Sequence, residues 1–459
     1  MSGLLGLLSL GSGALQAQNA GIATVGRNTA NVNTPGYSRE EIDLRSELGA
    51  PLVGGVRAET LSRAEDRLLA GRERTTAGEL GAADAQASAL SGLERELVPR
   101  GDDLVGQLGA LFSSFTELSG LPTSEPLRAK VVAAARAVAE RFAAQAGAID
   151  GAQRDADARI GDAAKQATAL MQEIATANRA LVVARDPVLA DKRDLAAKKL
   201  AELTGAQARL DPDGQMRVTL DGGQVLVDGG KAYALEATPD PARGGLSRLE
   251  IVDGARRDDV TARFGATTSG RIGGELAFRD GDAARARADL DQLAYDFMSS
   301  VNTVHRGYAG LDGVAGRDLF VAPAAVSGAA AAAAVDPAVG ADPRLVAAST
   351  VGAGPGDQAG ALALAALRDA PLAAAGSRTA GDEAIRLLSA VGQGARSVGE
   401  ARDLAAAKSD ALAAVRDGIS GVSTQDELQR LAAFQHASEA ATRFLSTVNE
   451  LLDQLVKNL

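Results

Sequence analysis

Apolar residues recur every three or four positions near the start of the chain, and this spacing predicts a helix. Leu4, Leu8, Leu15, Ile22, Val25 and Val32 fall on one stripe of that helix. A run rich in asparagine, proline and glycine interrupts the stripe at residues 28–39. Pro35 disfavours helical angles at the residue before it, and Gly36 permits a tight turn. The sequence therefore predicts an N-terminal apolar seam that ends in a turn.

The C-terminal residues carry a stricter pattern, with apolar residues at the a and d positions of a seven-residue repeat. A polar residue breaks the repeat only at Ser438. The apolar positions are Leu431, Phe434, Ala441, Leu445, Val448, Leu452, Leu455 and Leu459. Thr424 and Glu427 have the spacing of a capping box, which would begin this helix. Two apolar seams, one near each terminus, predict a paired coiled-coil stalk.

Long helical patterns occupy much of the chain between the two seams. Leucine and alanine recur at helical spacing over residues 63–185, with a stop at Pro99. Ser124 has the features of an N-cap, because a proline follows in the first turn. Helical spacing returns over residues 274–307 and 357–420. Long helices with alanine-rich faces indicate a bundle.

The pattern changes between residues 206 and 264, where short apolar runs alternate with Asp-Gly turns. Such turns between short apolar runs are typical of antiparallel hairpins, so we predict a small β domain here. Residues 308–356 are rich in alanine, proline and glycine. They are most simply a second excursion into the β domain or a loosely ordered linker.

The order of these patterns predicts the fold class and the domains. The fold is expected to be mainly α with a β insertion, in which the chain runs out and comes back. The predicted domains are a terminal coiled-coil domain (1–40 with 421–459), a helical bundle domain (41–205 with 268–307 and 357–420) and a β-rich outer domain (206–267 with 308–356). The two termini should therefore lie at one pole of the molecule.

Composition narrows the picture. The 459 residues exceed the roughly 250–300 at which a single core stops growing, so more than one domain is expected. Aromatic residues make up only 3% of the chain and tryptophan is absent, which favours thin helical seams over a thick core. The absence of cysteine excludes disulfides and thiolate metal sites. A net charge of -11 argues against nucleic acid as a partner.

Candidate chemistry is sparse. A zinc site would need both histidines of the chain, His305 and His436, plus a carboxylate from a distant segment, so we expect both to face solvent on helices. Gly230-Lys231 lacks the spacing of a phosphate loop, and residues 211–214 lack that of a calcium loop. The sequence therefore predicts no catalytic, metal-binding or cofactor-binding residue, and no cofactor.

The leucine-rich run at residues 4–10 resembles a signal peptide in hydrophobicity alone. No lysine or arginine precedes Arg27, whereas a secretory signal needs a positive start. The run is also shorter than the ~20 apolar residues of a membrane span. We expect neither a cleaved signal peptide nor a membrane span.

The run at residues 28–39 resembles the N-terminal signature of the axial proteins of the bacterial flagellum, the subunits of rod, hook and junction. The residues that match are Asn28, Asn31, Asn33, Pro35, Gly36, Tyr37, Ser38 and Arg39. The Tyr-Ser-Arg ending looks most like the hook-associated protein 1 family, whose members join the hook to the filament. Residues 189–195, 270–279 and 420–435 are similar to three further segments of that family.

This resemblance implies a structural subunit, not an enzyme, that assembles into a short ring at the hook–filament junction, outside the cell. It implies as partners copies of itself, the hook protein, hook-associated protein 3, a cytoplasmic export chaperone and the flagellar type III export apparatus. A hook or rod subunit remains an alternative, although long helical patterns weigh against it. An unrelated enzyme with helical arms is a third possibility.

The resemblance also bears on the two seams. An exposed apolar seam at residues 431–459 would be an aggregation hazard, so the export chaperone is expected to cover it before assembly. Pairing with the chain's own N-terminal helix is the weaker alternative, because each interior glycine costs that helix about 1 kcal/mol. The glycines concerned are Gly3, Gly6, Gly11, Gly13, Gly21 and Gly26. We expect residues 1–40 to be disordered in the free subunit.

Overall fold

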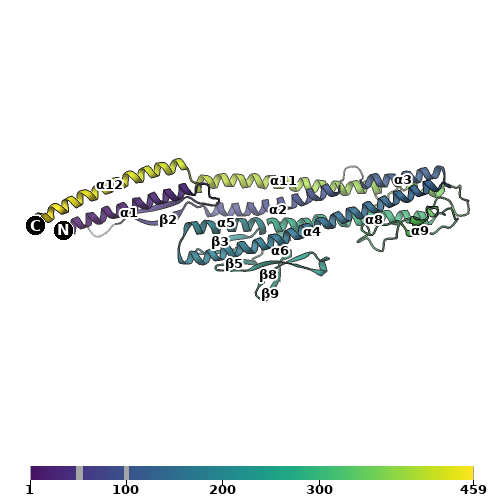
Figure 1. Cartoon of the computed structure of the whole chain (residues 1–459). Helices are drawn as coiled ribbons and strands as arrows, with labels where there is room; N and C mark the ends of the chain where they lie inside the picture. Colours follow the sequence, from purple (N-terminus) through teal and green to yellow (C-terminus); the bar gives the residue numbers. More distant parts are fainter. Residues whose placement is uncertain (1, 48–54, 98–102, 458–459) are drawn as a thin grey trace.

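The computed structural model describes residues 2–47, 55–97 and 103–457. The molecule is an elongated, mainly helical rod with both chain termini at one end (Figure 1). A narrow stalk carries the termini, and a wider body of long helices and short strands forms the rest. The predicted fold class, mainly α with a β insertion, is confirmed.

The stalk consists of α1 (Ser2–Ala30) and α12 (Thr424–Lys457), which run side by side (Figure 1). An antiparallel hairpin of β1 (Glu40–Glu47) and β2 (Gly55–Arg63) packs along α1. The sequence assigned this hairpin to the bundle domain, but its contacts place it with the stalk. Neither strand has the clean apolar alternation that would have marked it as a hairpin.

Two glycines set the close approach of α1 and α12. A Cβ atom on Gly11 would lie 2.6 Å from Cδ2 of Leu445, and one on Gly21 would lie 2.5 Å from Cε1 of Phe434. Cβ atoms at Gly3 and Gly26 would meet nothing within 4 Å. The glycines that were expected to weaken α1 thus include two that admit side chains of the α12 seam. Within this chain α1 is helical and packs on that seam. This differs from the expectation that residues 1–40 are disordered, and it agrees with the alternative in which the seam pairs with the chain's own N-terminal helix.

Gly21→Ala and Gly26→Ala are expected to act in opposite directions. Alanine at residue 26 should stabilise α1 by up to about 1 kcal/mol, because it meets nothing and favours the helix. Alanine at residue 21 must displace the ring of Phe434, and overpacking of this kind costs roughly 1–3 kcal/mol. Amide hydrogen exchange of α1 measures both effects. Equal gains in protection would show that α1 and α12 do not pack in this way.

The half of the body far from the stalk has its own apolar core, here called the distal core. Phe297 lies at its centre, with ring centroids 6.1 Å from Phe112, 6.1 Å from Phe142 and 5.6 Å from Phe320. The helices that build it are α2 (Arg67–Leu97), α3 (Leu104–Gly120), the first half of α4 (Glu125–Val183), α8 (Ala283–Arg306), α10 (Ala359–Ala366) and α11 (Ala380–Ser420).

Residues 308–356 pack into this distal core and not into the β region, so their predicted assignment to the outer domain is wrong. Leu319 and Phe320 are fully buried there. Asn302 fixes them, since its Oδ1 accepts from both backbone N–H groups at 3.0 and 2.9 Å. The segment contains α9 (Pro337–Ala341) and the 3-10 turn η3 (Pro343–Leu345). Its small side chains resemble a linker in composition, yet they fill the space between helices.

His305 is also buried, so the expectation that it faces solvent is wrong; His436 is exposed. The His305 ring lies between two backbone groups. Its Nδ1 donates to the carbonyl of Arg317 at 2.8 Å, and its Nε2 accepts from the N–H of Ala347 at 2.9 Å. This pairing selects the neutral ring, because a proton on Nε2 would oppose the Ala347 N–H. Burial lowers the pKa of His305.

The lowered pKa of His305 makes the distal core around it sensitive to acid. The unfolded histidine takes up a proton below its ordinary value of 6.5, whereas the folded one resists it. The stability contributed by neutral His305 is thus complete above pH 6.5 and is lost as pH falls towards the folded pKa, at no more than about 1.4 kcal/mol per pH unit. Hydrogen exchange over residues 308–349 as a function of pH measures it.

His305→Gln is expected to remove that pH dependence, since glutamine also offers one donor and one acceptor without titrating. His436→Gln on the exposed face of α12 is the matched control and should leave the slope unchanged. A slope that survives His305→Gln would assign the acid sensitivity to another group.

The half of the body beside the stalk has a second core, here called the proximal core. Two antiparallel sheets, ordered β3-β4-β5-β6 and β7-β8-β9, pack on the second half of α4, on α5 (Pro187–Thr204) and on α7 (Gly270–Leu276). The strands are β3 (Gln207–Leu210), β4 (Met216–Thr219), β5 (Val225–Asp228), β6 (Lys231–Ala232), β7 (Ala234–Pro239), β8 (Ser247–Asp253) and β9 (Arg256–Asp259). The short elements η1 (Pro241–Arg243) and α6 (Thr261–Thr267) complete the region.

The strands share this core with helices, so the β region is not a self-contained outer domain. Val218 and Leu226 lie in one buried cluster with Ile160 of α4 and Leu200 of α5. Helix α4 has 59 residues and is therefore roughly 90 Å long, enough to pass through both cores. A π-helical turn, η2 (Ala277–Asp282), connects α7 of the proximal core to α8 of the distal core. The body is one continuous unit with two cores.

Candidate functional site

The residues of the flagellar signature, 28–39, form the turn at the base of the stalk, here called the signature turn. Helix α1 ends at Ala30, and the N–H of Tyr37 donates to the carbonyl of Thr34 at 3.1 Å to close the turn. Gly36 has a φ of 83°, in the left-handed region that favours glycine. A Cβ on Gly36 would lie 3.2 Å from Cβ of Leu195 in α5. The turn therefore rests directly on the body.

Asn28 is the centre of this turn and is completely buried. Its Oδ1 accepts from the hydroxyl of Tyr37 and from the N–H of Glu40, both at 2.9 Å. Its Nδ2 donates to the carbonyl of Glu40 at 3.0 Å and to Oε2 of Glu427 at 3.1 Å. One amide thereby joins the end of α1, the signature turn, the start of β1 and the first turn of α12.

Two buried carboxylates surround Asn28, and each has a cationic partner. Glu40 is 1% exposed and accepts from Nε of Arg27 at 2.7 Å. Glu427, also 1% exposed, lies 3.4 Å from Nη1 of Arg430. A buried carboxylate is tolerated when a cation and hydrogen-bond donors pair with it. The base of the stalk is consequently a network of buried polar groups whose two cationic partners reach solvent.

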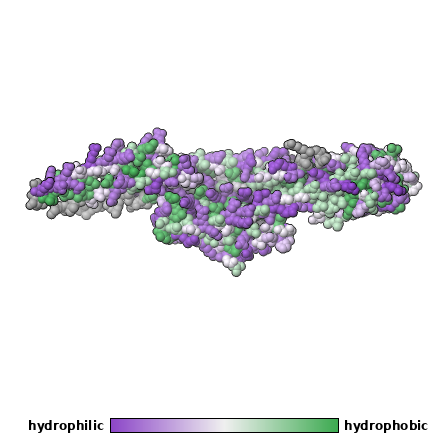
Figure 2. Space-filling model, viewed as in Figure 1, coloured by the Kyte–Doolittle hydropathy of each residue, from purple (hydrophilic) through white to green (hydrophobic). Residues whose placement is uncertain are grey.

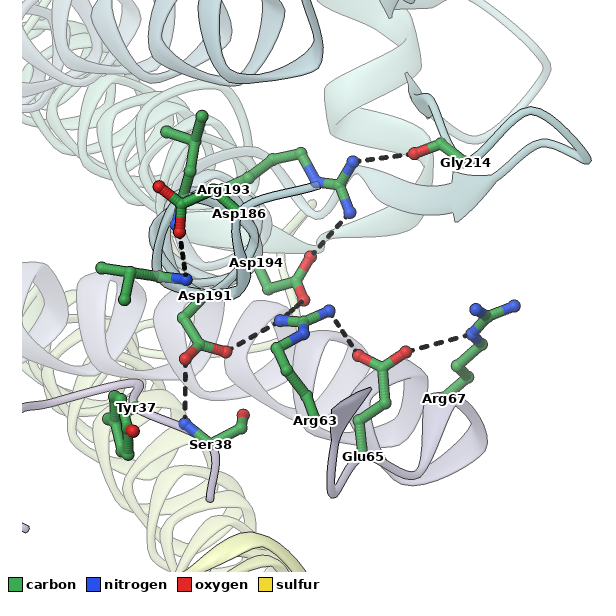
Figure 3. Close-up of polar contacts among 12 residues, drawn as sticks. Tyr37, Ser38, Arg63, Glu65, Arg67, Asp186, Asp191, Arg193, Asp194 and Gly214 are labelled. Carbon is green, nitrogen blue, oxygen red and sulfur yellow. Dashed lines mark hydrogen bonds and ion pairs between the residues drawn. The ribbon is translucent and has the colours of Figure 1, made fainter. Parts of the chain in front are cut away.

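A second network connects the signature turn to the body (Figure 3). The N–H of Ser38 donates to Oδ2 of Asp191 at 3.0 Å. Nη1 of Arg63, at the end of β2, donates to Oδ1 of Asp191 at 2.8 Å and to Oδ2 of Asp194 at 3.0 Å. Arg63 also pairs with Glu65, which in turn pairs with Arg67. Helix α5 thus holds both ends of the hairpin segment.

Arg193 extends this network into the β region. Its Nη1 donates to the carbonyl of Gly214 at 2.9 Å and lies 3.3 Å from Oδ1 of Asn178 in α4. Asn178 bonds in turn to both backbone groups of Met216 in β4, at 2.8 and 3.0 Å. Stalk, helical body and β sheet therefore meet at one turn of α5.

The two networks together form a joint between the stalk and the body, and burial decides the protonation of two of its groups. Burial raises the pKa of Asp191, and the hydrogen bonds from the Ser38 N–H and from Arg63 oppose that only in part. Burial also raises the pKa of Tyr37, and the carboxylates of Glu40 and Asp191 add to the rise. Tyr37 therefore keeps the hydroxyl proton that it donates to Asn28.

The structure brings together only some of the predicted signature residues. Asn28, Tyr37 and Ser38 belong to the networks above. Asn31 acts locally, because its Nδ2 donates to the carbonyl of Arg27 at 2.9 Å. Asn33 and Pro35 are exposed.

Arg39 contributes through its backbone as well as its side chain. Its N–H donates to the carbonyl of Ser420 at 2.8 Å, and its guanidinium pairs with Glu41 at 2.8 Å. The first of these bonds ties the signature turn to the end of α11.

The predicted seam residues differ in their exposure along the stalk. Val25 and Val448 are buried. The residues that are partly buried are Leu4, Leu8, Leu15, Ile22, Leu431, Phe434, Leu445 and Leu452. Val32 follows the end of α1 and is 40% exposed, so it does not belong to the seam; Leu455 is 37% exposed. Leu459 lies outside the described residues.

Sequence reasoning missed Glu40, Arg63, Asp191 and Asp194 as residues of this joint. Residues 189–195 resemble a segment of the family, but the resemblance gives no role to their side chains. Arg63 and Asp191 are 128 positions apart, and no local spacing signals such a pair. The predicted capping box of Thr424 and Glu427 is wrong, because Ser423 caps α12 by accepting from the N–H of Asp426 at 3.3 Å. Glu427 instead bonds to Asn28.

Among the residues that the structure describes, no group of three or more His, Asp or Glu side chains is placed to hold a metal ion. Within the same residues, no helix combines the length and the apolar character that a membrane crossing requires.

Comparison with known proteins gives consistent matches. Residues 90–320 match the model of the flagellar hook-associated protein FlgK helical domain. Flagellar hook-associated protein 1 of Bacillus subtilis (strain 168) is 26% identical, over 97% of this chain and 96% of that protein. The protein of the same name from Salmonella typhimurium is also 26% identical, over 67% of this chain and 57% of its own length.

A solved structure shares the fold. The flagellar hook junction protein FlgK from Burkholderia pseudomallei superposes with a TM-score of 0.69, covering 76% of this chain and 100% of that chain. The two sequences are 14% identical, so this likeness bears on the fold alone.

Proposed function

Because the chain belongs to the flagellar hook-associated protein FlgK family, we propose that it is a structural subunit of the bacterial flagellum that joins the hook to the filament. The observation that carries this is the family match over residues 90–320, which include most of both cores. The family is a structural one, so the chain is not an enzyme. Its relatives are hook-associated proteins, which does not favour a hook or rod subunit.

The stalk is the part that we assign to assembly, in a short ring of copies at the junction. It carries both termini and keeps apolar side chains at its surface, among hydrophilic ones (Figure 2). Exposed apolar residues of α12 include Phe444, Leu451, Leu455 and Val456. Since α1 covers only one face of α12, neighbouring copies have an apolar face left to bury.

The remaining partners follow from the same proposal. The hook protein and hook-associated protein 3 are the neighbours on either side of the ring. The chain reaches its place outside the cell through the flagellar type III export apparatus. A cytoplasmic chaperone accompanies it and binds α12, where it takes the place of α1 on the seam.

Electron microscopy of cells that lack this protein tests the junction assignment. Hooks without filaments are the expected result, with filaments restored by the chain supplied in trans. Cells without hooks would instead assign the chain to the hook or rod.

A further inference from the structure

A groove of about 980 Å³ lies beside the joint, between the start of α2, the strand β3 and helix α11. Its lining combines apolar and cationic side chains, among them Leu68, Arg74, Ala208, Met216, Lys408 and Leu412. Met216 and Ala208 form a buried floor, whereas Leu68 at the rim is 67% exposed. An exposed leucine over an apolar floor is the character of a recognition groove.

The strand beside the groove has a free edge. β3 is the first strand of its sheet and pairs only with β4 there. The carbonyl of Ala208 turns away from β4, because it accepts from Nη2 of Arg74 across the groove at 3.3 Å. Alternate residues of a strand present their backbone groups to the same edge, so Leu210 faces the groove as well.

The carboxylates that line the groove already have partners. Glu65 pairs with Arg63, and Asp194 pairs with the same guanidinium. Asp66 accepts from the backbone at the start of α2, and Asp221 accepts from the side chain of Gln207 at 3.1 Å. Glu65 and Asp194 are thus shared with Arg63, whereas Asp66 and Asp221 bond to neutral donors.

Three arginines of the groove have no ion-pair partner among residues 2–47, 55–97 and 103–457. They are Arg72, Arg74 and Arg209. Arg74 is the innermost, since it is partly buried whereas Arg72 and Arg209 are exposed. Burial lowers its pKa by more than Asp194, Glu73 and Glu65 raise it. A half-buried guanidinium that bonds only to a carbonyl gains strongly from a carboxylate, which it can bind through two parallel hydrogen bonds.

We propose that this groove docks an extended acidic segment of a partner protein, which adds as a strand to the free edge of β3 and places a carboxylate on Arg74. A backbone N–H of the docked segment donates to the carbonyl of Ala208 in place of Arg74. The Arg74 side chain then turns to the carboxylate of the segment. Strand addition of this kind takes its affinity from main-chain hydrogen bonds and its specificity from alternate side chains. The apolar floor receives the side chains that point inward. The proposal does not depend on the position of the chain in the flagellum.

A fluorescein-labelled pentapeptide of alternating valine and glutamate is a direct probe, with the lysine counterpart as its negative control. Each is titrated with the full chain, and fluorescence anisotropy reports binding. We expect saturable binding of the glutamate peptide that weakens with added salt, and none of the lysine peptide. Absence of glutamate-peptide binding up to about 1 mM, or equal binding of the lysine peptide, would overturn the proposal.

Arg74→Met is expected to weaken glutamate-peptide binding by more than about tenfold, the effect of a lost charge-assisted hydrogen bond. Arg67→Met is the matched control on the groove rim, because Arg67 is already paired with Glu65 and is 75% exposed. Its affinity should stay within about twofold of the parent. An N-methylated glutamate peptide, which cannot donate to β3, should also fail to bind; binding at full strength would exclude strand addition.

Sedimentation velocity separates a partner protein from a second copy of this chain. Self-association that Arg74→Met abolishes would assign the groove to a second copy and overturn the partner-protein proposal. A sedimentation coefficient that is independent of concentration, together with peptide binding that depends on Arg74, supports it. If Arg74→Met folds poorly by circular dichroism, Arg72→Met on the exposed rim replaces it, with weaker peptide binding again expected.

Discussion

Replacing Asn28 with alanine is expected to loosen the base of the stalk while the body stays folded. The change leaves the Tyr37 hydroxyl, the Glu40 backbone and the Glu427 carboxylate without their shared partner. Each buried group left unsatisfied costs about 1–3 kcal/mol, so a total loss of roughly 3 kcal/mol or more is expected. Hydrogen exchange should show faster exchange in α1 and α12 and unchanged exchange in both cores.

Asn33→Ala is the matched control for this experiment. Asn33 lies in the same turn and has the same side chain, but it is exposed. It should leave exchange unchanged, since surface changes usually stay within ±0.5 kcal/mol. If Asn28→Ala behaves like this control, the amide does not hold the stalk together.

Asn28→Asp separates the role of the amide from that of its shape. The new carboxylate still accepts from Tyr37 and Glu40, but it can no longer donate to Glu427, whose oxygen lies 3.1 Å from the present nitrogen. Two like charges in a buried site repel each other. We therefore expect exchange at least as fast as in Asn28→Ala at neutral pH, with partial recovery when acid protonates one of the pair.

The parts of the fold that sequence predicted are those that local chemistry decides. Ser124 caps α4 as expected, accepting from the N–H of Leu127 at 3.4 Å. Asp-Gly turns placed the strands between residues 206 and 264. In each case a few adjacent residues carry the whole signal.

The parts that sequence missed depend on partners distant along the chain. Asn28 and Glu427 are 399 positions apart, so neither neighbourhood reveals their bond. Residues 308–356 fill a space defined by α8 and α10, and a filling segment needs small side chains more than it needs periodicity. Likewise, the role of Gly21 in the packing of α1 on α12 depends on Phe434, which lies against it.

The pairing of α1 with α12 bears on how the proposed export chaperone would bind. In the folded chain α1 already covers the seam of α12, where Val448 is 2% exposed. A chaperone that binds the seam must therefore displace α1 or bind before α1 docks. The glycines of α1 favour that exchange, because each interior glycine lowers the stability of the helix by about 1 kcal/mol. Because α1 fits the seam but is a weak helix, neighbouring subunits can replace it there.

Changing Leu445, Val448 and Leu452 to aspartate is expected to abolish chaperone binding and junction assembly together. An unpaired charge at a buried position such as Val448 costs about 3–5 kcal/mol, far more than an exposed substitution. The thermal transition of the body should remain, because both cores lie outside α12. Calorimetry with the purified chaperone and complementation of motility measure the two losses.

Gln435→Asp, Thr442→Asp and Asn449→Asp form the control triple, which adds the same charge to exposed positions of the same helix. It should bind the chaperone with nearly unchanged affinity and restore motility. Seam variants that still bind the chaperone but fail to assemble would place the chaperone site elsewhere and leave the seam to α1 and neighbouring copies. Equal damage from both triples would mean that added charge alone, and not loss of the seam, disables α12.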